Sequence, residues 1–250
     1  MKLLKKTDKR RVVRQDRKWN VATNLVLGML VLSVGALCFA PTNNAITTEG
    51  DNAELYRSAG SDSCGVSLMF NVYWGTEDVY RILDTLKAHG AKATFFIGGC
   101  WADDNVDCLR DIYAAGHEIG NHGYFHKDHD KLSLEQNRKE IADCNRFIEL
   151  ALGAAPTLFA PPSGAYNNET LAACKALNMK TILWSRDTID WRDKNAALIY
   201  TRATKNVRGG EFVLMHPMEA TADALDDILK YYEKQSLSLI TVSENLQIKG

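Results

Sequence analysis

Two periodicities of apolar and polar positions alternate along residues 63–248. Short apolar runs predict buried strands, and stretches with an apolar residue at every third or fourth position predict helices. In Glu77–His89 the apolar positions form one helical face. The helix predicted over Ser133–Leu152 begins with the spacing of a capping box, in which Ser133 and Gln136 satisfy each other's backbone N–H groups.

The predicted strands and helices alternate in chain order. The strands are Val66–Val72, Lys92–Ile97, Thr157–Ala160, Thr181–Trp184, Phe212–Met215 and Leu237–Val242, with a short strand or a turn at His117–Gly120. The helices are Glu77–His89, Asn105–Ala115, Ser133–Leu152, Glu169–Leu177, Ala196–Val207 and Thr221–Lys234. This alternation is typical of a parallel sheet or a β/α barrel. In such α/β folds the chemistry gathers in loops after the C-terminal ends of the strands.

A longer apolar run precedes this domain. Val21–Ala40 contains no charged residue, and twenty residues of helix rise about 30 Å, the thickness of the hydrocarbon core of a bilayer. Residues 1–20 carry nine basic and two acidic side chains, so the positive-inside rule places this tail in the cytoplasm. We expect residues 21–40 to be a transmembrane signal anchor in the lipid bilayer. A cleaved signal peptide, which would release a secreted protein, and a buried core helix are the alternatives.

The net charge and composition agree with this topology. The formal charge of −1 is the sum of +7 in residues 1–20 and −8 in the remainder. The apolar share of 46% and the charged share of 24% are ordinary for a globular protein and exclude a disordered chain or a disulfide-dense miniprotein. Since topology explains the basic tail, it implies no nucleic-acid partner. Residues 41–62 are polar and predict a flexible extracellular tether before the outer domain, residues 63–248.

The cysteines outside the apolar run are odd in number and cannot all pair. They are Cys64, Cys100, Cys108, Cys144 and Cys174. Cys100 and Cys108 form the one local pair that merits a test as a disulfide, and helical patterns around the last two favour buried free thiols. The spacing contains no CxxC-type zinc signature.

Residues with metal-binding and acid–base chemistry follow the predicted strands. His122 and His126 are four positions apart, which puts both on one side of a helical turn, where neutral imidazoles can share a zinc ion. Asp190 can orient a histidine and hold it protonated, or it can simply cap a helix beside Trp191. His216 follows a strand and reaches the same rim, although a lone histidine there is more often structural.

Neighbouring residues have simpler interpretations. His117 and His129 flank the histidine pair and are expected to be bystanders. The loop at Pro161 and Pro162 is rigid, and it either walls a groove or is a plain turn.

In this order, the motifs resemble the polysaccharide deacetylase family, with its NodB-homology domain (carbohydrate esterase family 4). The ordered set is Phe70–Gly75 at the place of a Phe-Asp-Asp strand end, Thr94–Phe96, His122 with His126, Pro161 with Pro162, Asp190 with Trp191, and Leu214–His216. The resemblance covers residues 63–246 and looks closest to the membrane-anchored sporulation-type branch. It implies a distorted (β/α) barrel with a groove at the C-terminal ends of the strands.

The resemblance also implies a mechanism. In the family, a divalent metal, usually zinc, is held by one Asp and two His, and it activates water for attack on an N-acetyl group. A second Asp is the base, and a His assisted by an Asp protonates the leaving amine. Carried over to this chain, His122 and His126 are metal ligands, His216 is the acid and Asp190 is its partner. The implied substrate is a cell-wall glycan such as peptidoglycan or chitooligosaccharide, with Trp191 as groove wall and Leu214 beside the acetyl pocket. Independently of the resemblance, the aromatic rings of Trp74 and Tyr124 are candidate stacking surfaces for a glycan, and Pro162 can wall the groove.

Three positions depart from the family pattern. The base Asp falls on Asn71, the metal Asp on Val72, and the arginine that pairs with the base on Ala160. An amide does not take a proton from water near neutral pH, and valine cannot bind a metal. Loss of both the base and its arginine avoids an unpaired buried charge, which indicates a reorganised site. Gly123, in place of the usual serine or threonine, is a milder change.

Two classes of function therefore stay open. One is a working N-deacetylase in which another oxygen replaces the missing carboxylates; the candidates are Asn71, Glu77, Asp78, Asp103, Asp104 and Asp187. The other is a catalytically silent protein that binds glycan or acts as a scaffold. Retention of His122, His126, Asp190 and His216 favours a deacetylase-like protein over an unrelated α/β binding protein.

Overall fold

The computed structural model describes residues 55–60 and 63–247. The predicted basic tail and transmembrane segment, residues 1–40, lie outside the described residues, as does most of the predicted tether. Within the tether range, Leu55–Tyr56 form strand β1. In the described part of the chain, no helix is both long enough and apolar enough to cross a membrane.

The strands of the described residues form one sheet with nine members. Its order is β1–β6–β5–β4–β3–β2–β8–β7, with β9 paired to β2 outside this path, and all these pairings are parallel. After β1, the strands are β2 (Gly65–Val72), β3 (Thr94–Ile97), β4 (Glu118–Asn121), β5 (Leu158–Phe159), β6 (Lys180–Ile182), β7 (Arg186–Asp187), β8 (Phe212–Met215) and β9 (Ser238–Leu239). The predicted parallel α/β class is confirmed.

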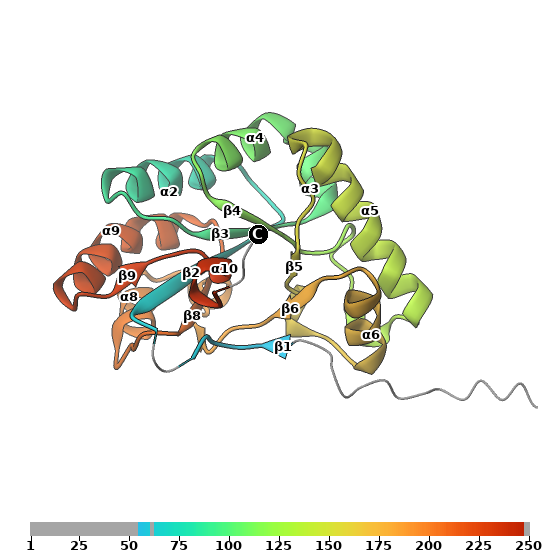
Figure 1. The fold of residues 1–250 in the computed structure, drawn as a ribbon. Helices are drawn as coiled ribbons and strands as arrows, with labels where there is room; N and C mark the ends of the chain where they lie inside the picture. The colour runs from blue at the N-terminus through green and yellow to red at the C-terminus, as the bar shows by residue number, and fades with distance from the viewer. Residues whose placement is uncertain (1–54, 61–62, 248–250) are drawn as a thin grey trace, which may run out of the picture. The chain divides into compact units, whose positions relative to one another are not determined.

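The sheet curls into a half-barrel with helices on its outside (Figure 1). Ser58, just after β1, forms an antiparallel bridge with Glu211, just before β8, so the curl is partly closed. The helices are α2 (Glu77–Ala88), α3 (Gly99–Asp104), α4 (Val106–Ala114), α5 (Leu134–Leu152), α6 (Asn168–Ala176), α7 (Asp190–Asp193), α8 (Ala196–Thr204), α9 (Glu219–Lys234) and α10 (Val242–Asn245), with short 3-10 turns at His129–Lys131 and Pro162–Gly164.

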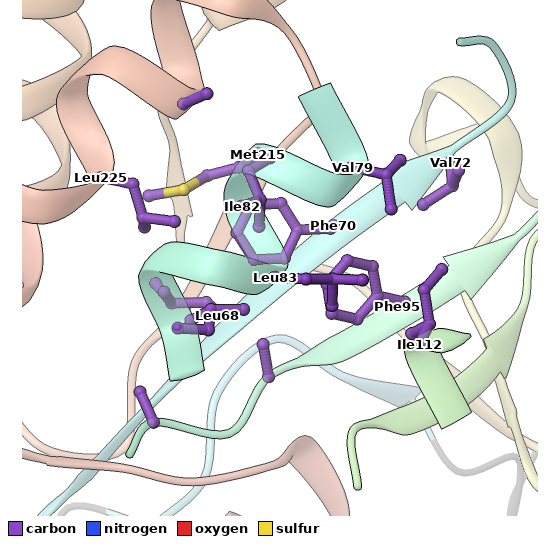
Figure 2. Close-up of a cluster of buried hydrophobic side chains, with 14 of the residues drawn as sticks. Leu68, Phe70, Val72, Val79, Ile82, Leu83, Phe95, Ile112, Met215 and Leu225 are labelled. Atoms are coloured by element: carbon purple, nitrogen blue, oxygen red, sulfur yellow. The ribbon is translucent and has the colours of Figure 1, made fainter. Parts of the chain in front are cut away.

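The largest hydrophobic core lies between the outer face of the sheet and the helices. Leu68, Phe70 and Val72 of β2 belong to it, together with apolar residues of α2 and α9. Figure 2 shows Val72 of β2 near Val79 of α2 in this core. Since side chains alternate along a strand, Met69 and Asn71 point to the inner face.

A second core fills the inside of the curl. Met69, Phe96 and Phe212 pack there around Val242, which begins α10. Helix α10 lies within the curl in Figure 1. Its backbone hydrogen-bonds to the start of β3, because Val242 N–H donates to Thr94 Oγ1 at 2.9 Å. The backbone N–H group of Val242, at the buried start of α10, therefore has a hydrogen-bond partner.

Several predicted elements differ at their ends. The strand predicted over Leu237–Val242 is only β9, and then Thr241 and Glu244 form a capping box that starts α10. The helix predicted over Asn105–Ala115 is preceded by a separate helix, α3. The capping box predicted at Ser133 is confirmed, with Gln136 N–H donating to Ser133 Oγ at 3.3 Å. All five cysteines of the described outer domain are free thiols, including Cys100 and Cys108.

Candidate functional site

The predicted site residues meet at the C-terminal ends of three strands. Asn71 lies near the end of β2, His122 directly follows β4, and His216 directly follows β8. The parallel register aligns these ends, because Phe70 is opposite Met215 on β8, and Ile97 of β3 is opposite Asn121 of β4. Parallel strands thus bring together residues that are far apart in the sequence.

His122 is buried and held in one tautomer. Its Nδ1 lies 2.7 Å from the carbonyl oxygen of Ala160, and since a carbonyl only accepts, Nδ1 carries the proton. The lone pair is then on Nε2, the arrangement that second-shell partners impose on metal-binding histidines. Burial lowers the pKa of His122 well below its usual value, so the ring is neutral at pH 7.

His126 lies beside His122, but not on a helical turn as predicted. The two ring centroids are 5.1 Å apart in an edge-on arrangement. The loop between them is irregular, with positive φ at Gly123 (75°) and His126 (52°). The predicted helical turn is therefore wrong, although the loop still brings the rings together. Burial lowers the pKa of His126 as well.

Tyr73, which the sequence did not single out, covers His126. The two ring centroids are 4.6 Å apart. Gly98 makes room for this ring, since a Cβ there would overlap Tyr73 Cδ2. Aromatic residues therefore occupy the surroundings of the histidine pair.

The described residues do not provide a third His, Cys, Asp or Glu ligand for a metal. Val72, at the family position of the metal aspartate, is fully buried in the outer core and points away from the histidines. Within residues 55–60 and 63–247, no three His, Cys, Asp or Glu side chains are grouped so that they could hold a metal. The replacement carboxylates Glu77, Asp78, Asp103, Asp104 and Asp187 therefore do not join the pair. Catalytic zinc normally takes three protein ligands, so the residues present do not fit a zinc centre of that kind.

The family position of the base is occupied by a buried amide. Asn71 is 3% exposed, and its Oδ1 has no hydrogen-bond partner among the described residues. Ala160, at the position of the arginine, is completely buried. Neither position therefore carries a charged side chain where the family has an Asp–Arg pair. Loss of both partners together leaves no unpaired buried charge.

Asp190 and His216 form the most complete hydrogen-bond cluster of the site. Asp190 is fully buried and accepts from the His216 backbone N–H at 2.6 Å and from His216 Nδ1–H at 2.8 Å. The Thr221 hydroxyl donates a hydrogen bond to the same carboxylate at 2.7 Å, and the backbone N–H of Trp191 donates one at 2.8 Å. The structure thus places the predicted acid and its partner together, and it adds Thr221, a residue that sequence reasoning missed.

Exposed aromatic rings surround the rim. Trp74 is 43% exposed and Trp191 is 51% exposed. The ring of Trp74 is nearly parallel to that of His216, with 5.8 Å between centroids and 9° between planes. Tyr124 is half-buried. Of the predicted glycan contacts, Pro162 and Leu214 are buried, so they support the wall of the site and expose little surface to a ligand.

His117 and His129, the two histidines expected to be bystanders, each hydrogen-bond to a nearby residue through Nδ1. Ala93 N–H donates to Nδ1 of His117 at 3.3 Å, and Nδ1 of His129 lies 2.6 Å from Asn137 Oδ1. Nε2 of His129 faces Gly123, where a Cβ would lie only 3.1 Å away. The family's serine or threonine would therefore be crowded at Gly123 in this loop.

Comparisons with known proteins agree with this geometry. A family model described as polysaccharide deacetylase matches residues 60–182. A peptidoglycan-N-acetylglucosamine deacetylase of Bacillus cereus is 34% identical over 175 residues, which cover 68% of this chain and 82% of that protein. YlxY of Bacillus subtilis is 33% identical over 208 residues, covering 83% of this chain and 65% of YlxY. The chain thus spans slightly less than two thirds of YlxY.

Among solved structures, BA3943 of Bacillus anthracis, described as a CE4 family pseudoenzyme, matches with a TM-score of 0.76 and 34% identity. The match covers 78% of this chain and 69% of BA3943. A mutant of BA3943 is described as having restored enzymatic activity, and it matches with the same TM-score. The similar proteins therefore include both deacetylases and a pseudoenzyme.

Proposed function

Because the chain belongs to the polysaccharide deacetylase family, we propose that it is a catalytically silent member, which binds cell-wall glycan in the groove that active relatives use for deacetylation. The family's deacetylases remove N-acetyl groups with a divalent metal. The observation that carries the proposal is the direction of Val72, whose side chain is in the outer core, so that no described His, Cys, Asp or Glu joins His122 and His126 as a third ligand.

Among residues 55–60 and 63–247, the family position of the base also holds no carboxylate. Asn71 cannot take a proton from water, and burial lowers the pKa of His122 and of the half-buried His126, which makes both imidazoles weaker bases. His216 keeps its Nδ1–H directed to Asp190, but protonating a leaving group serves no purpose if water is not activated first. The inherited acid is therefore present without the rest of the reaction machinery.

The rim retains features that suit a neutral sugar polymer. Trp74, which stacks on His216, and Trp191, which follows Asp190 in the chain, both expose aromatic rings. Aromatic rings bury a large apolar area at low conformational cost. Asn71 Oδ1 is an unused acceptor that can receive an N–H donor of a bound glycan.

We place this domain outside the cell as part of the same proposal. The basic tail and the apolar segment over residues 21–40 support a single-pass anchor with the domain on the extracellular side. The glycan-binding domain would then lie close to the membrane, next to the cell wall. Cleavage of the segment would instead give a secreted protein.

The test uses the purified full chain in nonionic detergent. We expect less than one equivalent of zinc by elemental analysis, no acetate release from chitooligosaccharide or peptidoglycan, and retention on insoluble peptidoglycan. Trp191→Ala should weaken retention about fivefold, in line with the loss of one aromatic stacking contact. Tyr113→Ala, which removes an exposed ring on α4 away from the rim, is the matched control.

A working deacetylase is the second candidate, favoured by the intact Asp190–His216 pair. In that case, His122 and His126 would hold zinc together with Asn71 Oδ1. Stoichiometric zinc, with acetate release that is lost in His216→Ala, would establish this candidate and overturn the silent assignment.

A further inference from the structure

A cleft with a volume of about 690 Å³ lies beside the inherited site. Trp74 forms its boundary with the site, since it lines the cleft and also stacks on His216. Met218 and Pro217 add apolar walls from the segment between β8 and α9. The cleft thus continues the proposed glycan surface away from the histidine pair.

Acidic side chains outnumber basic ones in the lining of the cleft. Four carboxylates line it, from Glu77, Asp78, Glu219 and Asp223, against one ammonium group, from Lys194. Arg81 pairs with Asp78 at 3.0 Å and with Asp223 at 2.5 Å. Among the described residues, the side chains of Glu77 and Glu219 have no hydrogen-bond or ion-pair partner, and both residues line the cleft.

A bare cation does not suit this arrangement. In the described part of the chain, no three acidic, histidine or cysteine side chains are grouped closely enough to hold a metal ion. The exposed ring of Trp74 and the apolar walls instead suit an organic ligand with one flat apolar face. The complementary ligand combines such a face with a positive charge.

We propose that this cleft binds a hexosamine unit whose amine is free, so that the protein recognises wall glycan that has already been deacetylated. The sugar ring stacks on Trp74, and its ammonium group lies between Glu77 and Glu219. An N-acetyl group would remove the charge and leave both carboxylates without a partner. This inference rests on the proposed function, because it assumes that glycan lies along the rim.

The experiment compares chitosan pentamer, in which every amine is free, with fully acetylated chitopentaose. Binding to the full chain in nonionic detergent is measured by calorimetry at pH 6, where an alkyl amine is protonated. We expect at least fivefold tighter binding of the deacetylated oligomer at low salt, and a smaller preference at 0.5 M salt, because salt screens exposed charges.

Two variants separate the roles of charge and stacking. Glu77→Gln with Glu219→Gln should weaken chitosan binding about fivefold to tenfold and leave chitopentaose binding unchanged. Trp74→Ala should weaken both ligands. Glu135→Gln, an exposed carboxylate on α5 outside the cleft, is the control and should change neither affinity.

The two proposals fail in different ways. Equal affinity for both oligomers, or a glutamate double variant that binds chitosan like the parent chain, would overturn the cleft assignment alone. Binding of neither oligomer would overturn the glycan-binding function together with it.

Discussion

Asp190 accepts two hydrogen bonds from a single residue, His216, which donates its backbone N–H at 2.6 Å and its Nδ1–H at 2.8 Å. One carboxylate thereby fixes both the chain direction after β8 and the orientation of the imidazole. In an active deacetylase such a pair holds the acid in place. In a silent member, the same pair fixes the His216 ring on which Trp74 stacks.

Asp190→Asn should destabilise the domain by about 2–3 kcal/mol. The carboxylate oxygens receive four donors in a fully buried place, and an amide nitrogen would face donors instead of accepting from them. Urea unfolding of the full chain, followed by tryptophan fluorescence, measures the change. Asp107→Asn, whose side chain is 96% exposed, should change stability by less than about 0.5 kcal/mol. Equal effects of the two variants would show that the cluster is not a structural clamp.

Val72→Asp should cost about 3 kcal/mol or more and should not create a zinc site. The side chain lies in the outer core, where an unpaired carboxylate has no hydrogen-bond partner. Val72→Ala should cost about 2 kcal/mol through the cavity that it leaves. Unfolding free energies and zinc content are measured for both variants. One tightly bound zinc per Val72→Asp chain, at parental stability, would contradict the outward direction of this residue.

Gly98→Ala should displace Tyr73 from His126. A Cβ at this position would overlap the tyrosine ring, which cannot move without leaving the histidine. Overpacking of this kind costs about 1–3 kcal/mol. The ring-proton chemical shifts of His126 report the displacement, and Gly60→Ala, which meets no atom within 4 Å, is the control. Unchanged His126 shifts in Gly98→Ala would mean that the two rings do not pack together.

His117 should make the domain less stable as the pH falls from 6.5 towards 4. Burial lowers the pKa of His117 to about 4, while an unfolded histidine titrates near 6.5. The unfolded chain therefore takes up the proton first, and stability that is complete above pH 6.5 is lost on acidification. His117→Asn keeps an acceptor for Ala93 N–H and should reduce this loss by about 2 kcal/mol, as measured by urea unfolding at pH 7 and 4.5. An identical pH slope in parent and variant would exclude this role.

His89 should show the opposite dependence. Hydrogen bonds to Asp226 and Glu233 raise its pKa. Its contribution to stability is therefore complete below pH 6.5 and disappears as the pH rises through the folded-state pKa. His89→Gln should lose about 0.5–1 kcal/mol at pH 5.5 and little at pH 9, because both partners are half-exposed. A loss that is the same at both pH values would indicate packing as the cause.

Local signals in the sequence were sufficient for the long elements. The strand Phe212–Met215 agrees in both ends with β8, and Ser133 and Gln136 cap α5 as their spacing predicts. The short elements β7 and α7 were missed, because two-residue and four-residue segments carry no periodicity of their own. Their structure depends on pairing with β8 and on the bonds to Asp190.

The direction of Val72 was hidden for a different reason. All eight residues of β2 are buried, so the strand has no exposed face to serve as a reference. The polar residues Ser67 and Asn71 share one face, but the sequence does not show that this face is the inner one. The two faces become distinguishable only in the folded chain, where α2 and α9 cover the face of Val72 and α10 lies against the face of Asn71. Thr221 could not be inferred either, since it lies 31 positions from the carboxylate that it contacts.

Helix α10 closes the inside of the curled sheet at the end opposite the histidines. Ser67 and Thr94, in the first half of β2 and at the start of β3, hydrogen-bond to residues Thr241 and Val242. In the described part of the chain, α10 therefore blocks this end of the interior, and a polymer cannot thread from one end to the other. A long glycan bound as proposed would lie across the open mouth and leave by the side that it entered, so internal units of an unbroken strand would be as accessible as its ends.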